Sequence, residues 1–196
     1  MTPDLGEALL PTPSQTVGPF FHHCLPWPQG PAVVPADHPA AVVLEGAVWD
    51  GDGAPVADAV VEVWQVDPQG HPVRDGEGRE GDGRDRDDPE FRGFGRCPTD
   101  ERGHYRFTTL KPGGTSTVDG DPQAPYVHLL VFARGLLRQV VTRVYFPDEP
   151  DANERDPVLA QLPAQRRERL VARAVDGGYA FDVHLQGPHE TPFFAA

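Results

Sequence analysis

Few residues of this sequence have types and spacings that suggest chemistry. The run His22-His23-Cys24 could chelate a metal ion, but it lies in an irregular, proline-rich segment. Acidic residues crowd the 75–90 stretch, yet they lack the fixed spacing of a calcium-binding loop. We therefore expect a solvated loop at 75–90 and regard the histidine run as a weak metal candidate.

Two arginines are the basic residues that strand structure is best placed to hold. Arg134 and Arg143 lie in residues 126–146, where two apolar, β-branched runs flank Ala133-Arg134-Gly135. Such runs favour strands, and Arg-Gly between them predicts a tight reversal with Gly135 free to adopt a positive φ. Either guanidinium could bind a carboxylate; Arg134, at the corner, could instead simply face water.

The common catalytic motifs are absent from the sequence. It holds no GxSxG, no phosphate-binding glycine loop and no HExxH. Cys24 and Cys97 are too few for a disulfide framework and match no zinc motif, so we expect two reduced thiols. His128 and His184 lie in predicted strands, where a lone histidine is more often a hydrogen-bonded core residue than a ligand. These residues alone give no self-contained catalytic set.

Composition restricts the class of protein. A chain of 196 residues is long enough for one domain with a sizeable core. Its 23 prolines and 21 glycines favour short strands joined by turns. The net charge of −13 would repel nucleic acid. No apolar run approaches the roughly 20 residues needed to cross a bilayer, and the acidic first residues lack the basic region of a signal peptide, so we expect a cytoplasmic location.

Apolar and alternating runs predict seven strands and one helical region. The helical region is 156–173, which Pro163 divides into a short turn and a longer helix. We expect the 126–132 run, apolar on both faces, to be a central strand buried on both, and the next run to have one wet or partner-facing side. This pattern predicts an all-β sandwich or barrel-like core with one or two short helices. The predicted strands are Val42–Trp49, 56–65, Phe94–Pro98, 104–110, 126–132, 136–146 and 179–186.

The chain divides into an arm and a domain. Residues 1–40 are rich in proline and lack periodicity, yet they hold Phe20, Phe21 and Trp27. An arm of that composition is usually laid over a surface, either that of its own domain or that of a partner. We expect residues 41–196 to form the β domain, with the charged, glycine-rich 71–93 loop as an insertion.

Several motifs together resemble the intradiol ring-cleavage dioxygenases. They are TPSQTVGPF at 12–20, VEVWQ at 61–65, GR at 95–96 with TD at 99–100, GHYRF at 103–107 and LKPG at 110–113. Further segments make the chain similar to the alpha chains of two-chain members: FARG at 132–135, YF at 145–146, YAF at 179–181, QG at 186–187 and PFF at 192–194. The likeness covers nearly the whole chain in the expected order, with only 71–93 and 22–40 loosely matched. It implies the family's β-sandwich fold.

The departures from the family concern iron. Iron-bearing members hold non-haem ferric iron with two tyrosines and two histidines. Here no tyrosine lies between 65 and 96, GTST stands at 114–117 where the second tyrosine is expected, and Tyr126 and His128 occupy the histidine positions. One ligand of four cannot hold iron. The resemblance therefore implies a chain with no metal site of its own, in which Tyr126 and His128 are degenerate ligand positions.

The same resemblance implies a supporting role in an enzyme. Fe(III) is expected on a homologous beta chain, and this chain, inactive alone, is expected to form part of the active-site wall. The complex would use O2 to open the ring of protocatechuate, a catechol with a carboxylate, giving 3-carboxy-cis,cis-muconate. Arg134 is expected to approach the carboxylate, and Phe20 replaces a tyrosine found in some alpha chains. The expected substrate-binding residues are Gln15, Thr16, Gly18, Pro19, Phe20 and Arg134.

Two alternatives stay open. A stand-alone β-sandwich binding module without catalysis, of a transthyretin-like or carbohydrate-binding type, would explain the strands but not the arm. A homo-oligomeric dioxygenase with a relocated iron site is opposed by the missing tyrosines.

Overall fold

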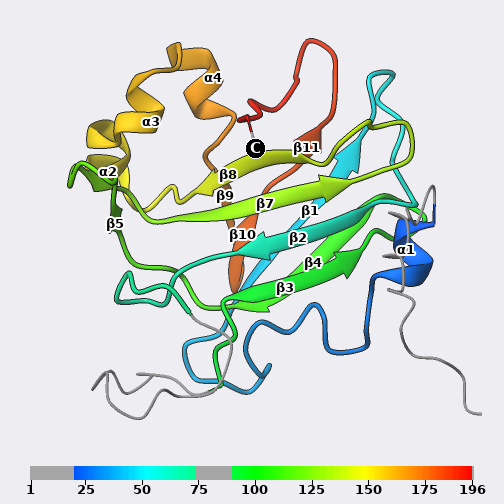
Figure 1. Ribbon diagram of the computed structural model, residues 1–196, viewed down its shortest axis with the longest axis horizontal. Helices are drawn as coiled ribbons and strands as arrows, with labels where there is room; N and C mark the ends of the chain where they lie inside the picture. The colour runs from blue at the N-terminus through cyan, green and yellow to red at the C-terminus, as the bar shows by residue number, and fades with distance from the viewer. Residues whose placement is uncertain (1–19, 74–89, 196) are drawn as a thin grey trace, which may run out of the picture.

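Two β-sheets that pack face to face form the body of the protein in this computed structural model, which describes residues 20–73 and 90–195 (Figure 1). The four-stranded sheet has the order β3-β2-β7-β8, with every neighbouring pair antiparallel. Its strands are β2 Val60–Trp64, β3 Phe94–Pro98, β7 Tyr126–Phe132 and β8 Val140–Tyr145.

The other large sheet is built around β1. This strand pairs antiparallel with β4 and parallel with β10 and β11, while β9 pairs with β10. The strands are β1 Val42–Trp49, β4 His104–Thr109, β9 Arg173–Val175, β10 Gly178–Ala180 and β11 Val183–His184. A small hairpin of β5 Thr115–Ser116 and β6 Pro122–Gln123 lies apart from both sheets.

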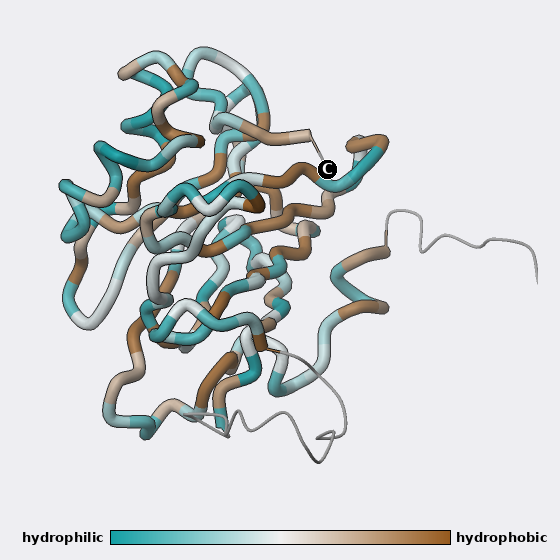
Figure 2. Tube along the Cα trace, turned by 60° about the vertical axis from the view of Figure 1, so that its left-hand side comes forward, coloured by the Kyte–Doolittle hydropathy of each residue, from teal (hydrophilic) through white to brown (hydrophobic). Residues whose placement is uncertain are grey.

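Alternation along the strands produces the core. In β7 the inward residues Val127, Leu129 and Val131 are fully buried, and they pack with Val61 and Val63 of β2 and with residues of the opposite sheet. Hydrophobic residues gather in the strands and hydrophilic ones in the connecting segments (Figure 2). The all-β sandwich predicted from the sequence is confirmed.

The strand predictions differ from the structure mainly at strand ends. Val42–Trp49 and Phe94–Pro98 match. The predicted 136–146 strand begins only at Val140, because Leu136 closes the turn through its N–H to the Ala133 carbonyl. The predicted 179–186 strand is divided into β10 and β11.

The two faces of β7 and β8 also differ from expectation. β7 is central, but only one of its faces is fully buried; the outward residues, including Tyr126 and His128, are half-buried. In β8, Thr142 is not on a wet face. It is completely buried, and its hydroxyl donates to the Pro192 carbonyl at 2.9 Å. Arg143 is the polar residue of β8 whose side chain lies on the outer face.

The helical region predicted at 156–173 is confirmed in part: it is divided at Pro163 as predicted, but its second helix ends at Glu168, and the helix before Asp156 was not predicted. The structure has α2 Pro150–Arg155, α3 Pro157–Ala160 and α4 Ala164–Glu168, each short, and the chain is extended at Asp156. Asp156 caps α3, and Pro163 precedes α4, so each interrupts helical hydrogen bonding. No helix in the described ranges has the length and apolar character needed to cross a membrane.

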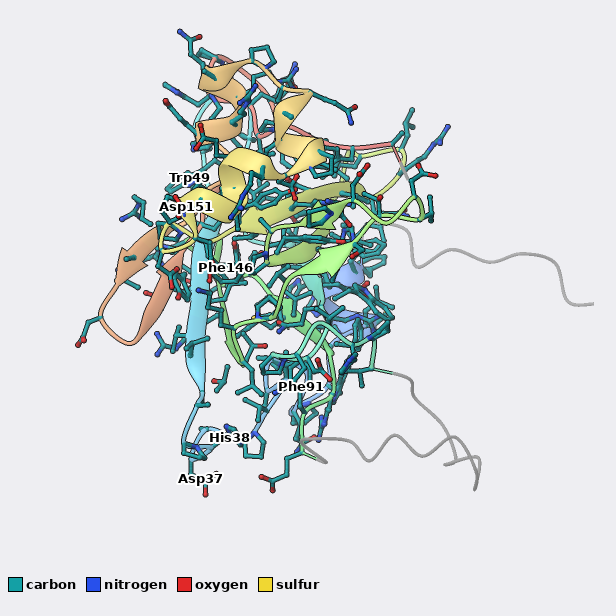
Figure 3. All side chains as sticks on the ribbon, turned by 90° about the vertical axis from the view of Figure 1, so that its left-hand side faces the viewer. Asp37, His38, Trp49, Phe91, Phe146 and Asp151 are labelled. Carbon is teal, nitrogen blue, oxygen red and sulfur yellow. The ribbon has the colours of Figure 1, made fainter. Side chains whose placement is uncertain are left out.

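The described part of the arm packs on the domain. A helical turn, α1 Phe21–Cys24, forms despite the nearby prolines, and Phe21 packs on Phe132 with ring centroids 5.9 Å apart. Further along, Val33 is fully buried and its N–H donates to the Thr108 carbonyl. Figure 3 shows Phe91, which is also buried, at the same end of the molecule as Asp37 and His38.

One buried carboxylate fastens this arm to the four-stranded sheet. Glu62 is nearly inaccessible and accepts from the Arg96 Nε at 2.7 Å. The same guanidinium donates to the Leu25 carbonyl at 2.9 Å and lies 5.4 Å from the Trp27 ring centroid. The arm is therefore held by a charge-assisted contact as well as by apolar packing.

Candidate functional site

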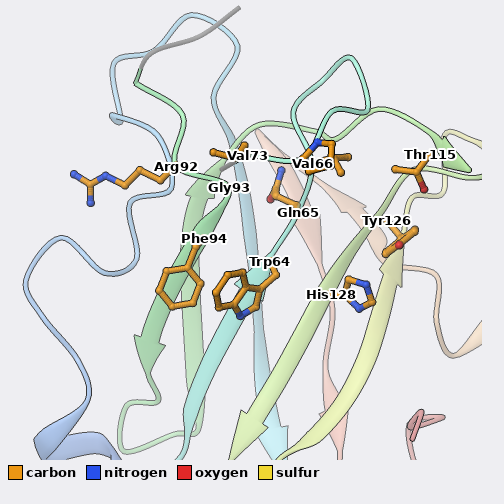
Figure 4. Close-up of a pocket in the computed structure, with 11 residues that line it drawn as sticks. Trp64, Gln65, Val66, Val73, Arg92, Gly93, Phe94, Thr115, Tyr126 and His128 are labelled. Atoms are coloured by element: carbon orange, nitrogen blue, oxygen red, sulfur yellow. The ribbon is translucent and has the colours of Figure 1, made fainter. Parts of the chain in front are cut away.

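The outer face of the four-stranded sheet carries a row of aromatic and basic side chains. Strand register places Trp64 opposite both Phe94 and His128, and His128 opposite Arg143. Trp64, Phe94, Tyr126 and His128 line a cavity of about 280 Å³, and Figure 4 shows them rising from three adjacent strands. Tyr126 and His128, the two predicted degenerate ligand positions, both line this cavity.

Tyr126, His128 and Arg143 form a compact cluster. The rings of Tyr126 and His128 meet edge to face with centroids 4.9 Å apart. The Arg143 guanidinium carbon lies 4.0 Å from the centroid of the Tyr126 ring, a close cation–π contact. Burial and, to a smaller extent, the Arg143 charge lower the pKa of His128 to about 4, so its imidazole is neutral near pH 7.

A second cavity opens on the other side of His128. It has a volume of about 460 Å³, and Arg143 contributes to its wall together with Phe194, near the end of the sequence. The N–H of Phe194 donates to the Val141 carbonyl, so the end of the chain extends along the edge of β8. Arg143 therefore lies between the packed outer face of the sheet and this second cavity.

Ferric iron does not fit the Tyr126–His128 cluster. The Arg143 guanidinium over the Tyr126 ring puts a positive charge beside the cluster, which disfavours a second cation there, and the low pKa of His128 reflects that charge in part. No group of three His, Cys, Asp or Glu side chains in the described residues is arranged to hold a metal ion. The 1–19 and 74–89 segments contain no tyrosine, histidine or cysteine that could add a ligand.

The hydroxyls of the other three tyrosines have hydrogen-bond partners outside the Tyr126–His128 pair. The Tyr105 hydroxyl donates to the Phe181 carbonyl at 2.5 Å, and the Tyr179 hydroxyl lies 3.2 Å from a carboxylate oxygen of Asp148. Tyr145 is fully buried, its hydroxyl donates to Asp156 at 3.2 Å, and burial raises its pKa. Tyr145 lies beside the cluster, with its ring centroid 5.8 Å from that of Tyr126, but its raised pKa keeps the hydroxyl protonated.

The comparison with known proteins decides the family. The family model described as "Dioxygenase" matches residues 16–187. The protocatechuate 3,4-dioxygenase alpha chain of Burkholderia cepacia is 41% identical over 202 residues, covering 93% of this chain and 96% of that protein. The chain belongs to the intradiol ring-cleavage dioxygenase family. Members of this family depend on non-haem iron.

Other relatives support the assignment. The protocatechuate 3,4-dioxygenase alpha chain of Pseudomonas putida is 37% identical over 96% of this chain and 98% of that protein. The beta chain of the Burkholderia cepacia enzyme is 36% identical over 77% of this chain and 66% of that protein. Catechol 1,2-dioxygenase from Acinetobacter sp. ADP1 has a TM-score of 0.58 at 21% identity, covering 78% of this chain and 55% of that chain, which shows a shared fold.

Of the expected substrate-binding residues, Phe20 and Arg134 lie in the described part of the chain, near the end of β7 opposite Tyr126. Gln15, Thr16, Gly18 and Pro19 lie outside the described residues. Phe20 is 57% exposed and precedes α1. Arg134 follows β7 in the predicted turn, where Gly135 has a φ of +92°, and its Nε lies 3.2 Å from a carboxylate oxygen of Asp58. The 69% exposure of the Arg134 side chain leaves this ion pair open to solvent.

Two features of this family member were missed by sequence reasoning. The sequence indicated that a strand holds Arg143, but not that Arg143 contacts Tyr126. The pairing of β7 residues with β8 residues across the turn would have been the signal for this contact. The partnership of Asp58 with Arg134 joins residues far apart in the chain and had no local signal.

Proposed function

We propose that this chain is the subunit without iron in a two-chain protocatechuate 3,4-dioxygenase. The observation that supports this most is the guanidinium of Arg143 at the degenerate ligand position, in a chain 41% identical to an alpha chain. In this proposal a homologous beta chain holds Fe(III). The bound iron supplies the oxygen chemistry that opens the protocatechuate ring between its two hydroxyl-bearing carbons, giving 3-carboxy-cis,cis-muconate.

The proposed role of this chain is to form one wall of the substrate cavity. Arg134 would bind the substrate carboxylate, for which a planar guanidinium is well suited. Its present partner, Asp58, is held in a solvent-exposed ion pair, and such pairs contribute only about 0–1 kcal/mol. A ligand carboxylate could therefore replace Asp58 at small cost.

The arm would supply the rest of that wall. Gln15, Thr16, Gly18, Pro19 and Phe20 are proposed to line the cavity. The packing of Phe21 on Phe132 supports this, because Phe132 stands two residues before Arg134. The arm thus enters the described structure close to the turn that carries the arginine.

The test is expression of this chain alone and together with a candidate beta chain. Iron content, visible absorbance and protocatechuate-dependent O2 uptake are measured for both preparations. We expect iron, colour and activity only in the co-expressed complex. A coloured, active chain on its own would overturn the proposal, and a soluble monomer that forms no complex would favour a stand-alone binding module.

A further inference from the structure

We propose that the cavity beside Arg143 binds a small aromatic carboxylate in this chain itself. The inference is independent of the proposed subunit role, because it concerns the degenerate ligand position and not the turn at Arg134. It begins from the unused hydrogen-bonding capacity of one arginine.

Among the described residues, Arg143 lacks a carboxylate partner of the kind that three other arginines in or beside the strands have. Arg96 pairs with Glu62, Arg106 with Glu45 and Arg134 with Asp58. Arg143 has no carboxylate oxygen within 4.0 Å among the described residues, and its one hydrogen bond is a 3.3 Å contact from Nη1 to the Tyr145 hydroxyl. A guanidinium has five N–H donors, so most of its donors are unused.

The acid behind Tyr145 does not supply the missing partner. Asp156 is completely buried, and its two oxygens accept from the backbone N–H groups of Ala124, Val158 and Leu159 as well as from Tyr145. Four donors satisfy this carboxylate. Among the described residues, the positive charge of Arg143 is therefore without a direct counter-ion, although the side chain is only half-exposed.

The cavity wall suits an aromatic ligand. Apolar side chains surround the arginine, and the volume of about 460 Å³ lies within the range of small-molecule sites. Phe194 lies 5.9 Å from the guanidinium carbon, and Tyr126 stacks on the guanidinium at 4.0 Å. His128 also faces this cavity and has no hydrogen-bond partner among the described residues. The lining residues are His128, Val141, Arg143, Val158, Gln161, Leu162, Phe194 and Ala195.

Benzoate is the probe, and benzyl alcohol is its uncharged counterpart. Titration calorimetry of the full chain should show one benzoate site, with benzyl alcohol bound about 10-fold more weakly or not at all, because a hydrogen bond to a charged group is lost. Arg143→Gln should weaken benzoate binding about 10-fold or more. Arg138→Gln is the matched control: it removes the same charge from an exposed position and should leave binding unchanged.

Arg143→Lys protects the test against misfolding. This variant keeps the charge but loses the bidentate geometry, so benzoate binding should fall by less than in Arg143→Gln. The Arg143 Nε–H signal in an NMR titration should shift with benzoate and not with benzyl alcohol. Equal binding of the two probes, or benzoate binding unchanged in Arg143→Gln, would overturn the proposal.

The same variants separate this inference from the proposed function. In a complex with the beta chain, Arg143→Gln should remove one benzoate site per pair of chains and retain protocatechuate-dependent O2 uptake. Loss of the Arg143 site with normal uptake supports both proposals. An Arg143 site in a chain that never forms an active complex would overturn only the subunit role.

Discussion

The β7–β8 pair carries an arginine near each of its ends, and the two are held in different ways. Arg143 is half-buried, stacks on Tyr126 at 4.0 Å and lacks a carboxylate partner among the described residues. Arg134 is largely exposed and pairs with Asp58 at 3.2 Å. Packing fixes the first guanidinium, whereas an exchangeable ion pair holds the second.

The two arginines therefore suit different roles. Arg143 is part of the packed structure, whereas Arg134 can exchange its ion-pair partner for a ligand. At the Arg143 end, a guanidinium lies over the ring of Tyr126, a predicted degenerate ligand position, and a neutral histidine completes the cluster. At the Arg134 end, the charge can change partners without disturbing the core. In the proposed function, one end of these strands has lost its metal site, while the opposite end is suited to a substrate carboxylate.

The largest effect is expected from the support beneath the Arg143 end. Asp156→Ala should lower the free energy of unfolding by about 3 kcal/mol, because three buried N–H groups and the Tyr145 hydroxyl lose their acceptor. Urea denaturation measures the change. Asp151→Ala, an exposed acid of α2, is the control and should cost less than about 0.5 kcal/mol. Similar costs for both would remove Asp156 from this role.

The next effect concerns substrate choice at the Arg134 end. In the complex with a beta chain, Arg134→Ala should reduce kcat/KM for protocatechuate about 10-fold, the loss expected for one charged hydrogen bond. Catechol, which lacks the carboxylate, should change less than about 2-fold. Steady-state O2 uptake with both substrates measures this. Equal losses would exclude Arg134 from binding the carboxylate.

Local patterns predicted the strands well and the connections poorly. Alternation in Val42–Trp49 and Phe94–Pro98 decides both strands because each has one face toward the core. The helical periodicity of 156–173 predicted too long a second helix, because the backbone of Leu170 and Ala172 bonds to Tyr145 of β8 and the helix ends at Glu168. Such tertiary contacts are absent from any local window of sequence.

For the candidate site too, local residue types were informative and contacts between separate segments were not. The absence of iron ligands was predicted from residue types alone, because no tyrosine stands where the resemblance places one, and it stays a prediction. The placement of Arg143 over Tyr126 depends on strand register, which the β7–β8 turn sets. The ion pair of Arg134 with Asp58 depends on how separate parts of the chain meet, so the sequence could suggest an anion partner but not this one.

A smaller effect should distinguish the two ends by pH. Because the pKa of His128 falls from 6.5 to about 4 on folding, the unfolded chain binds a proton that the folded chain does not between these values. Stability should therefore fall as pH falls from about 6.5 to about 4, and stay level in this respect below that. We expect a loss of about 1 kcal/mol after allowing for solvent screening at this half-buried site. His128→Gln should remove this part of the pH dependence of urea denaturation; an unchanged slope would contradict it.

The smallest effect is expected at Asp58, and it tests whether the Arg134 ion pair is exchangeable. Asp58→Ala should change the free energy of unfolding by less than about 0.5 kcal/mol, because Arg134 is 69% exposed and water can solvate it. Asp52→Ala, at an exposed turn, is the control and should behave alike. If Asp58 only competes with a substrate carboxylate, its removal should also lower the KM for protocatechuate in the complex by about 2-fold, and added salt should reduce that gain. A destabilisation above 2 kcal/mol would mean that the pair is structural, and the contrast with Arg143 would then no longer hold.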